Sequence, residues 1–233
     1  MNMIVKIWAK IQRKWMKLRL QPIRVFCLHH VCEQFDVETM YPCDRMALSE
    51  FKQKINALRR QGFQFISLTV AYNHIKNDYF RRKKYAVLTF DDGYKSLLEV
   101  LPWLEKQSIP ATLFINGKYL DGKSFRDKDT ERYLTKHDLF SSSSLSSSLI
   151  EIGSHGWEHT DAARMNIEMF ILNINENVSL LKKHPRYVPF HAYTWGRHNT
   201  QTDNHLHSIQ IIPVFMDGLK NYCELNIIHR ELL

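Results

Sequence analysis

The chain has 233 residues, of which 44% are hydrophobic and 24% are charged, and no apolar run approaches the roughly 18 residues that span a bilayer. These values predict one globular domain and exclude an integral membrane protein. The net charge is +8, but residues 1–20 contain six basic residues and no acidic one, so the rest carries only +2. This balance argues against a nucleic-acid partner.

The N-terminal segment 1–21 is predicted to form a basic amphipathic helix. At ~100° per residue one arc is apolar, and the opposite arc is basic. The apolar arc holds Ile4, Ile7, Trp8, Ile11, Trp15 and Leu18, and the basic arc holds Lys6, Lys10, Arg13, Lys14 and Lys17. Tryptophans opposite lysines are typical of a helix at a membrane surface. The alternative is that the apolar arc packs on the domain while the lysines are solvated.

Basic residues recur every three or four positions as far as Arg19, so this segment lacks the unbroken apolar core of a secretory signal. We therefore expect a cytoplasmic protein, and the predicted helix could hold it at the inner face of the membrane. The four cysteines form no C-x-x-C pair and no zinc-finger spacing. We interpret them as free thiols in a reducing compartment.

In residues 22–233, short apolar strands alternate with helices, the pattern of a parallel βα fold. Eight candidate strands suggest an α/β fold that forms a barrel or a barrel-like curled sheet. They are 24–28, 63–68, 85–90, 111–115, 149–153, 188–193, 209–215 and 225–229. Helices are predicted over 47–61 and 167–183, and the serine-rich stretch 141–148 is expected to be an exposed loop or helix end.

Two carboxylates follow the apolar run in "LTFDDGYKS", residues 88–96. Functional groups of parallel βα folds gather at the carboxyl ends of strands, and consecutive side chains there point in different directions. One carboxylate can therefore bind a metal while the other faces the substrate. The alternative is that Asp91 and Asp92 only cap the next helix, but one Asp suffices for that, and burying two acids is costly without a cation.

Two histidines follow a second apolar strand in "IEIGSHGWEHT", residues 150–160. His155 and His159 are four residues apart, a spacing used in many zinc sites. A single histidine is more often structural than a ligand, but a pair at one strand end and acids at another favour a metal site. One Asp and two His leave coordination positions open, as in a catalytic metal centre.

With these motifs the sequence resembles the polysaccharide deacetylases, carbohydrate esterase family 4, which carry the NodB homology domain. The resemblance rests on "LTFDDGY" at 88–94, "IPATLFING" at 109–117 and "EIGSHGWEHTDAARM" at 151–165, in that order. Looser matches are "CLHHV" at 27–31 and "FHAYTWGRHN" at 190–199. The resemblance implies that residues 22–233 are a catalytic domain of this family, an α/β fold with a distorted (β/α) barrel of about seven to eight parallel strands. It also implies one divalent metal ion, usually zinc, that serves to remove acetyl groups from N-acetylated sugars.

Carried over by this resemblance, Asp91 is the general base, and Asp92, His155 and His159 are the metal ligands. The third motif departs from the family, which usually has Arg-Pro-Pro-Tyr-Gly or Ala-Tyr-Pro-Tyr-Gly where this chain has residues 192–196, "AYTWG". The arginine that steadies the base in many members is therefore absent. We expect this loop to form a sugar-facing wall from Tyr193, Trp195, Arg197 and His198, with core packing as the alternative for the two aromatic residues.

The general acid has three candidates. The family's last motif places a histidine after a Leu-x pair, and the formal match is His229 in "IIHREL", which also reads as an ordinary closing strand. His29 and His30, at the end of the first strand, are the rivals for this role.

The predicted function is a metal-dependent hydrolase that removes N-acetyl groups from a sugar of a polysaccharide, an oligosaccharide or a lipid-linked glycan. The same metal and base also suit a deformylase or another amidohydrolase, because this chemistry does not select the acyl group. A non-catalytic carbohydrate-binding relative is the third alternative. A binding module, however, has no use for a base such as Asp91 beside a metal site.

Overall fold

The structure is a computed structural model that describes residues 21–33, 45–77, 82–121, 133–221 and 226–233. The predicted helix at 1–20 lies outside these residues. Within the described ranges, no helix combines the length and the apolar character needed to cross a membrane.

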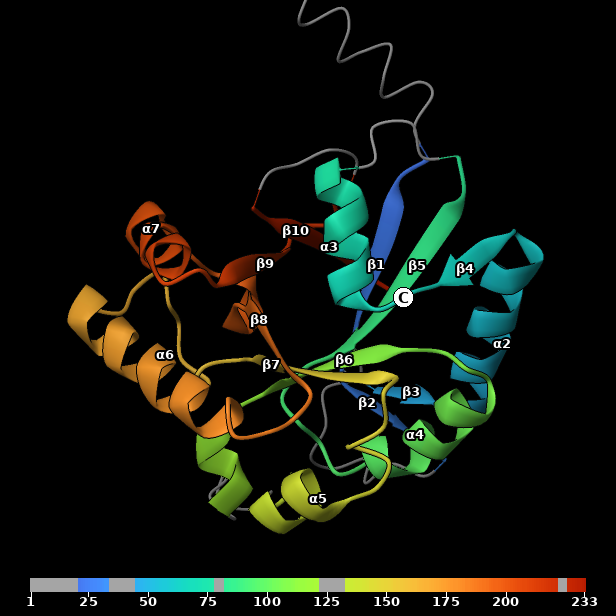
Figure 1. The fold of residues 1–233 in the computed structure, drawn as a ribbon, viewed down its shortest axis with the longest axis horizontal. Helices are drawn as coiled ribbons and strands as arrows, with labels where there is room; N and C mark the ends of the chain where they lie inside the picture. Colours follow the sequence, from blue (N-terminus) through green and yellow to red (C-terminus); the bar gives the residue numbers. More distant parts are fainter. Residues whose placement is uncertain (1–20, 34–44, 78–81, 122–132, 222–225) are drawn as a thin grey trace, which may run out of the picture.

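Parallel strands form a closed barrel that matches the predicted fold class (Figure 1). The ring runs β1–β5–β6–β7–β8–β9–β10 and closes where β10 pairs with β1. Its strands are β1 (Ile23–Leu28), β5 (Lys84–Phe90), β6 (Ala111–Ile115), β7 (Ile150–Ser154), β8 (Tyr187–Ala192), β9 (Ile212–Met216) and β10 (Ile228–Leu232). The short β4 (Phe63–Phe65) pairs with the first residues of β5 outside the ring, and β2 (His30–Cys32) pairs with β3 (Arg45–Ala47) as a separate ladder.

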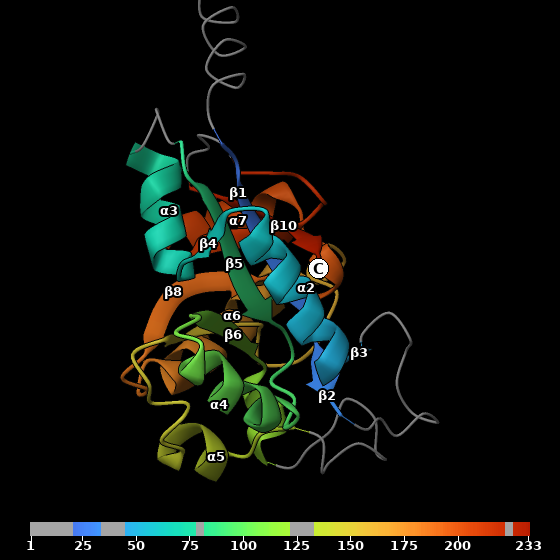
Figure 2. The same cartoon turned by 90° about the vertical axis from the view of Figure 1, so that its right-hand side faces the viewer.

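Helices cover the outside of the barrel, with α6 and α7 on one side and α2 and α4 on the other (Figures 1 and 2). The helices are α2 (Leu48–Arg60), α3 (Leu68–Asn77), α4 (Leu97–Lys106), α5 (Lys136–Ser141), α6 (Ile167–Leu181) and α7 (Thr200–Ser208), with the 3-10 turns η2 (Gly117–Asp121) and η4 (Thr194–Gly196). The predicted helices over 47–61 and 167–183 correspond to α2 and α6. The buried face of α2 carries apolar residues at helical spacing, which are Leu48, Phe51, Ile55 and Leu58.

Strand alternation divides the core into an inner and an outer part. Apolar side chains that fill the barrel include Val25, Val87, Phe114, Ala192 and Ile228. The alternate residues of the same strands pack outward, against α2 and α4 on one side and against α6 and α7 on the other. A residue's position in its strand therefore decides whether it can reach the barrel interior.

Three predicted strands differ from the observed strands by more than one residue at an end. The strand predicted over 63–68 stops at Phe65, because the buried Glu151 carboxylate accepts the backbone N–H of Leu68 at 3.0 Å and so caps α3. The strand predicted from residue 209 begins at Ile212, after Gln210 turns with φ 61°. The last strand, predicted over 225–229, starts at Ile228 and continues to Leu232. Arg230 is thereby placed inside the barrel wall.

Candidate active site

The two carboxylates directly after β5 point to different partners. Asp91 continues the strand, with its backbone N–H donating to the Leu28 carbonyl at 2.9 Å. Asp92 has a left-handed φ of 69°, followed by Gly93 at 76°. Such a φ is strained for a residue other than glycine and is typical of functional sites. This sharp turn separates the two side chains, so the adjacent acids can have different partners.

Asp92, His155 and His159 converge on one point. The Nε2 atoms of His155 and His159 lie 3.2 and 3.3 Å from Oδ1 of Asp92, and the three ligand atoms lie within 4.8 Å of one another. That Oδ1 atom is buried and has no hydrogen-bond partner among the described residues. Burial alone would raise the pKa of Asp92, but the two imidazoles lower it well below its usual range.

His155 is held in the tautomer that a metal ligand needs. Its Nδ1 lies 2.7 Å from the Ala192 carbonyl, which can only accept, so Nδ1–H is the donor. In the neutral ring, Nε2 therefore presents its lone pair toward Asp92. The Asn116 side chain also donates to the backbone carbonyl of His155 at 2.7 Å, which fixes the start of this loop. An orphaned carboxylate oxygen and an oriented imidazole fit a bound divalent metal.

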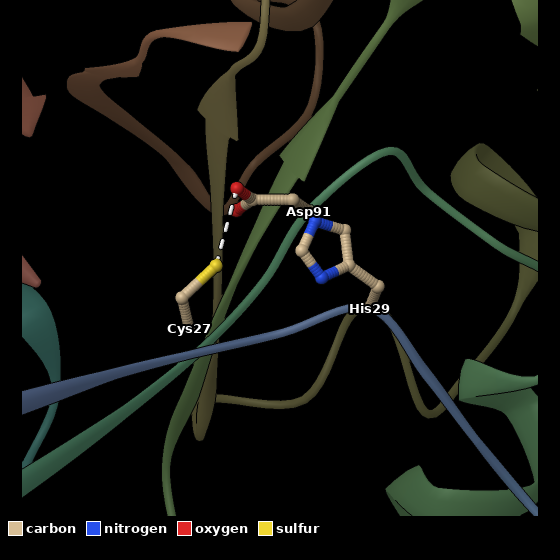
Figure 3. A group of neighbouring side chains, drawn as sticks. All are labelled: Cys27, His29 and Asp91. Atoms are coloured by element: carbon tan, nitrogen blue, oxygen red, sulfur yellow. Dashed lines mark hydrogen bonds between the residues drawn. The ribbon is translucent and has the colours of Figure 1, made fainter. Parts of the chain in front are cut away.

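Asp91 lies beside this group and is buried, with 3% of its surface exposed. Arg230 from β10 donates to both of its oxygens, Nη1 to Oδ1 at 2.6 Å and Nη2 to Oδ2 at 2.8 Å. The Cys27 thiol donates to Oδ2 at 3.4 Å (Figure 3). Burial would raise the pKa of Asp91, but Arg230, followed by His155, lowers it to about 2, so the carboxylate is ionised at neutral pH.

Cys27, His29 and Asp91 form a second group whose donor atoms are within 4.8 Å of one another (Figure 3). We do not assign a metal to this group, because the guanidinium of Arg230 already engages both oxygens of Asp91. Burial raises the pKa of Cys27 well above its usual range, so this residue is a neutral thiol. The group therefore consists of the ionised Asp91, a thiol donor and a histidine.

The three candidate acids occupy different places. His29 shares the donor group of Asp91 and lines a pocket of about 190 Å³ beside the end of β1. His30 is buried, with its ring centroid 3.5 Å from that of Tyr94. His229 lies on the outer side of β10, where its Nδ1 is 2.6 Å from Oδ2 of Asp217. Strand alternation turns His229 away from the interior that Arg230 enters, so the structure places it apart from Asp91, and the assignment of the acid stays a prediction.

The predicted sugar-facing wall is only partly present. Tyr193 is 1% exposed, its hydroxyl donates to Asp203 at 2.8 Å, and it packs under α6 and α7. The structure therefore places Tyr193 in the core, as in the alternative given above, and not in an exposed wall. His198 also bonds Asp203, at 2.9 Å, and stacks on Phe215 with centroids 4.1 Å apart. These contacts give His198 a packing role.

Trp195 and Arg197, by contrast, remain at the surface. Trp195 is 53% exposed, and its ring stands perpendicular to that of His159 with centroids 4.5 Å apart. Arg197 donates to Asp161 at 2.8 Å, and its guanidinium lies 5.8 Å from the Trp195 ring. These two residues therefore form a wall directly beside a proposed metal ligand.

Two residues of the site were not predicted from the sequence. Arg230 follows the apolar pair Ile227–Ile228, and the signal that could have revealed it was a charged residue in register with the inward-facing Ile228. Cys27 had no such signal, since a cysteine within an apolar strand reads as an ordinary core residue.

Comparisons with known proteins agree with this geometry. The model of the family named polysaccharide deacetylase matches residues 78–213, more than half of the chain. The chain belongs to the polysaccharide deacetylase family. It is therefore a hydrolase that acts on carbon–nitrogen bonds other than peptide bonds and removes N-acetyl groups from a carbohydrate. No curated protein sequence matches the chain.

Several solved structures share the fold of this deacetylase over almost its whole length. IcaB from Ammonifex degensii is 19% identical, with a TM-score of 0.76 over 92% of this chain and 94% of that one. The Streptococcus pyogenes deacetylase PplD, solved in complex with acetate, is 18% identical with a TM-score of 0.75 over 91% and 92%. A de-N-acetylase from Aggregatibacter actinomycetemcomitans is 14% identical with a TM-score of 0.75 over 91% and 95%.

Proposed function

We propose that this chain is a zinc-dependent N-deacetylase whose metal ligands are Asp92, His155 and His159, with Asp91 as base and His29 as acid. The observation that carries the proposal is the approach of both imidazole Nε2 atoms to one orphaned oxygen of Asp92. Two nitrogens and one carboxylate oxygen suit zinc, and three protein ligands leave positions open for water and substrate.

Two residues beside the metal site each carry out one proton transfer, Asp91 as the base and His29 as the acid. When bound, a divalent metal would supply Lewis-acid activation of water and of the amide carbonyl. Asp91 is ionised and next to Asp92, so it takes the proton of the attacking water. His29 lies in the donor group of Asp91 and borders an open pocket, which supports it as the donor to the departing amine. His30 lines the same pocket, but its ring packs against Tyr94 and it is not in the donor group of Asp91, while His229 contacts Asp217 on the outer side of β10.

The sugar is expected to approach along the exposed face of Trp195. Aromatic rings bind the apolar faces of sugar rings, and this ring is fixed against His159. Arg197 next to it can contact polar groups of the same sugar. An N-acetylated sugar stacked on Trp195 would therefore present its acetamide near the metal ligands.

Metal analysis of the purified protein and product analysis together test this proposal. Zinc should be present at about one ion per chain, and acetate should be released from at least one member of a panel of N-acetylated oligosaccharides. Assays for formate and for other carboxylates on matched substrates distinguish a deformylase or another amidohydrolase. Protein that binds zinc and oligosaccharide but releases no carboxylate would support a non-catalytic relative.

We further propose that residues 1–20 bind the inner surface of the membrane and bring the enzyme to a lipid-linked glycan. The support is the opposition of Trp8 and Trp15 to the basic arc in the sequence, together with an attraction of about 1 kcal/mol per basic residue near anionic lipid. Full-length protein should sediment with anionic vesicles at low salt and less with neutral ones, while a chain lacking residues 1–20 should not. Equal binding of the shortened chain would show that the segment is structural.

A further inference from the structure

Arg230 is a fully buried arginine in the last strand of the barrel. Besides its two bonds to Asp91, Nη1 donates to the Thr89 hydroxyl at 3.1 Å, and the guanidinium lies 5.3 Å from the centre of the Phe114 ring. The Thr89 hydroxyl in turn donates to the Phe26 carbonyl at 2.8 Å. Residues of β1, β5 and β6 thus hold the guanidinium in one orientation.

We propose that Arg230 is the positioning residue of the catalytic base, and that β10 therefore completes the active site of this enzyme. The inference rests on the proposed role of Asp91. A planar guanidinium that binds both carboxylate oxygens prevents the carboxylate from rotating, which a single point charge cannot do. The Cys27 thiol adds a third donor to Oδ2. Asp91 is thereby fixed relative to Asp92 and the proposed metal.

A base held in this way is important because proton transfer requires a close and directed approach. Misplacement by about 1 Å can cost a factor of 100 in rate. Two described neighbours of Asp91 do not fix its plane, since His155 Nε2 is 4.0 Å from Oδ2 and Cys27 contacts one oxygen only. Arg230 is the contact on which the orientation of Asp91 depends.

Kinetic constants and zinc content of Arg230→Lys test the proposal. The lysine keeps the positive charge but cannot bind both oxygens, so we expect unchanged zinc, a KM within about twofold and a kcat lowered about 10- to 100-fold. In Arg230→Ala, added guanidinium ion should restore part of the lost kcat, because it can occupy the emptied space beside Asp91. A lysine variant with wild-type kcat would overturn the proposal.

Glu231→Gln is the matched control. Glu231 is the next residue of β10 and pairs with Arg24 of β1 at 2.7 Å, so its loss weakens the same strand pair without touching Asp91. The control should keep kcat near that of the wild type. An equal loss of kcat in Glu231→Gln and Arg230→Lys would show that general loosening of β1 and β10 is responsible, and would overturn the positioning role.

A substrate-free measurement separates this inference from the proposed activity. Arg230→Met leaves Asp91 buried and uncompensated, so its Tm should fall, and adding Asp91→Asn should restore part of the loss. Strictly additive effects on Tm would overturn the contact on which the inference depends. Absence of acetate release by the wild type, with the predicted coupling present, would instead refute the proposed function alone.

Discussion

The two sides of the barrel differ in how closely they follow the motifs of the family. The side formed by β5, β6 and β7 carries "LTFDDGY", "IPATLFING" and "EIGSHGWEHTDAARM", and the structure brings Asp92, His155 and His159 together there. On the side formed by β8, β9 and β10, the third motif begins with Ala192 where many members have arginine. Here the structure supplies Arg230 from a different strand.

This difference shows that the site depends on positions in space more than on positions in the chain. Ala192 and Ile228 both face the barrel interior, and Arg230 is two residues beyond Ile228, so it faces the same space. A small residue at 192 leaves room there for a long side chain from β10. A missing motif residue is therefore weak evidence against activity until the facing strands have been inspected.

The largest expected effect is loss of the metal on the motif-bearing side. Asp92→Asn, His155→Ala and His159→Ala should each lose bound zinc, and activity should fall below about 1% of wild type, because removing one of three protein ligands removes much of the affinity. Zinc analysis and acetate release measured on the same preparations check this. His207→Ala, at an exposed histidine of α7, is the control and should change neither quantity. Full zinc occupancy with normal turnover in any ligand variant would contradict the assignment.

Asp91→Asn should separate the two adjacent acids. We expect zinc to be retained and activity to fall by at least about 100-fold, the usual scale for loss of a general base. The asparagine also leaves the buried Arg230 without its carboxylate partner, so Tm is measured beside zinc content. Loss of zinc as complete as in Asp92→Asn would mean that the two roles have been exchanged.

A smaller effect is expected from the acid, for which His29 after β1 is compared with His229 on β10. His29→Gln should lower kcat by about 10- to 100-fold, since proton donation to the amine is lost. His229→Gln should stay within about threefold of wild type in kcat and affect Tm instead, because it loses the contact to Asp217. A greater loss of kcat in the His229 variant would reinstate the formal motif match.

The sequence predicted the barrel, and it singled out Asp92, His155 and His159, which the structure brings together, because both follow from local patterns. Apolar strands reveal themselves by composition, and the ligands sit directly after two of them. It predicted the β10 side poorly, because His229, Arg230 and Glu231 interrupt the apolar run although they lie in the strand. A strand whose inward residue pairs with a buried acid has no apolar signature, and its partner is 139 residues away in sequence.

The smallest expected effect concerns Trp195 and Tyr193, which are two residues apart but have different environments. Trp195→Ala should raise KM for an oligosaccharide by about three- to tenfold, the scale of a lost aromatic contact, with little change in kcat. Because Trp195 also contacts His159, zinc content is measured to show that the ligand is undisturbed. An unchanged KM would exclude this ring as the sugar wall.

Tyr193→Phe is the matched aromatic change and should have the opposite outcome. Only the hydroxyl that donates to Asp203 is lost, so KM should be unchanged. One buried hydrogen bond is worth about 1 kcal/mol, which corresponds to a Tm lower by about 2–4 °C in a domain of this size. Trp195 follows Tyr193 by two residues, yet its left-handed φ of 51° lies in the turn that carries it from the packed outer face to the surface. A rise in KM for Tyr193→Phe equal to that for Trp195→Ala would mean that the whole turn, and not one exposed ring, positions the sugar.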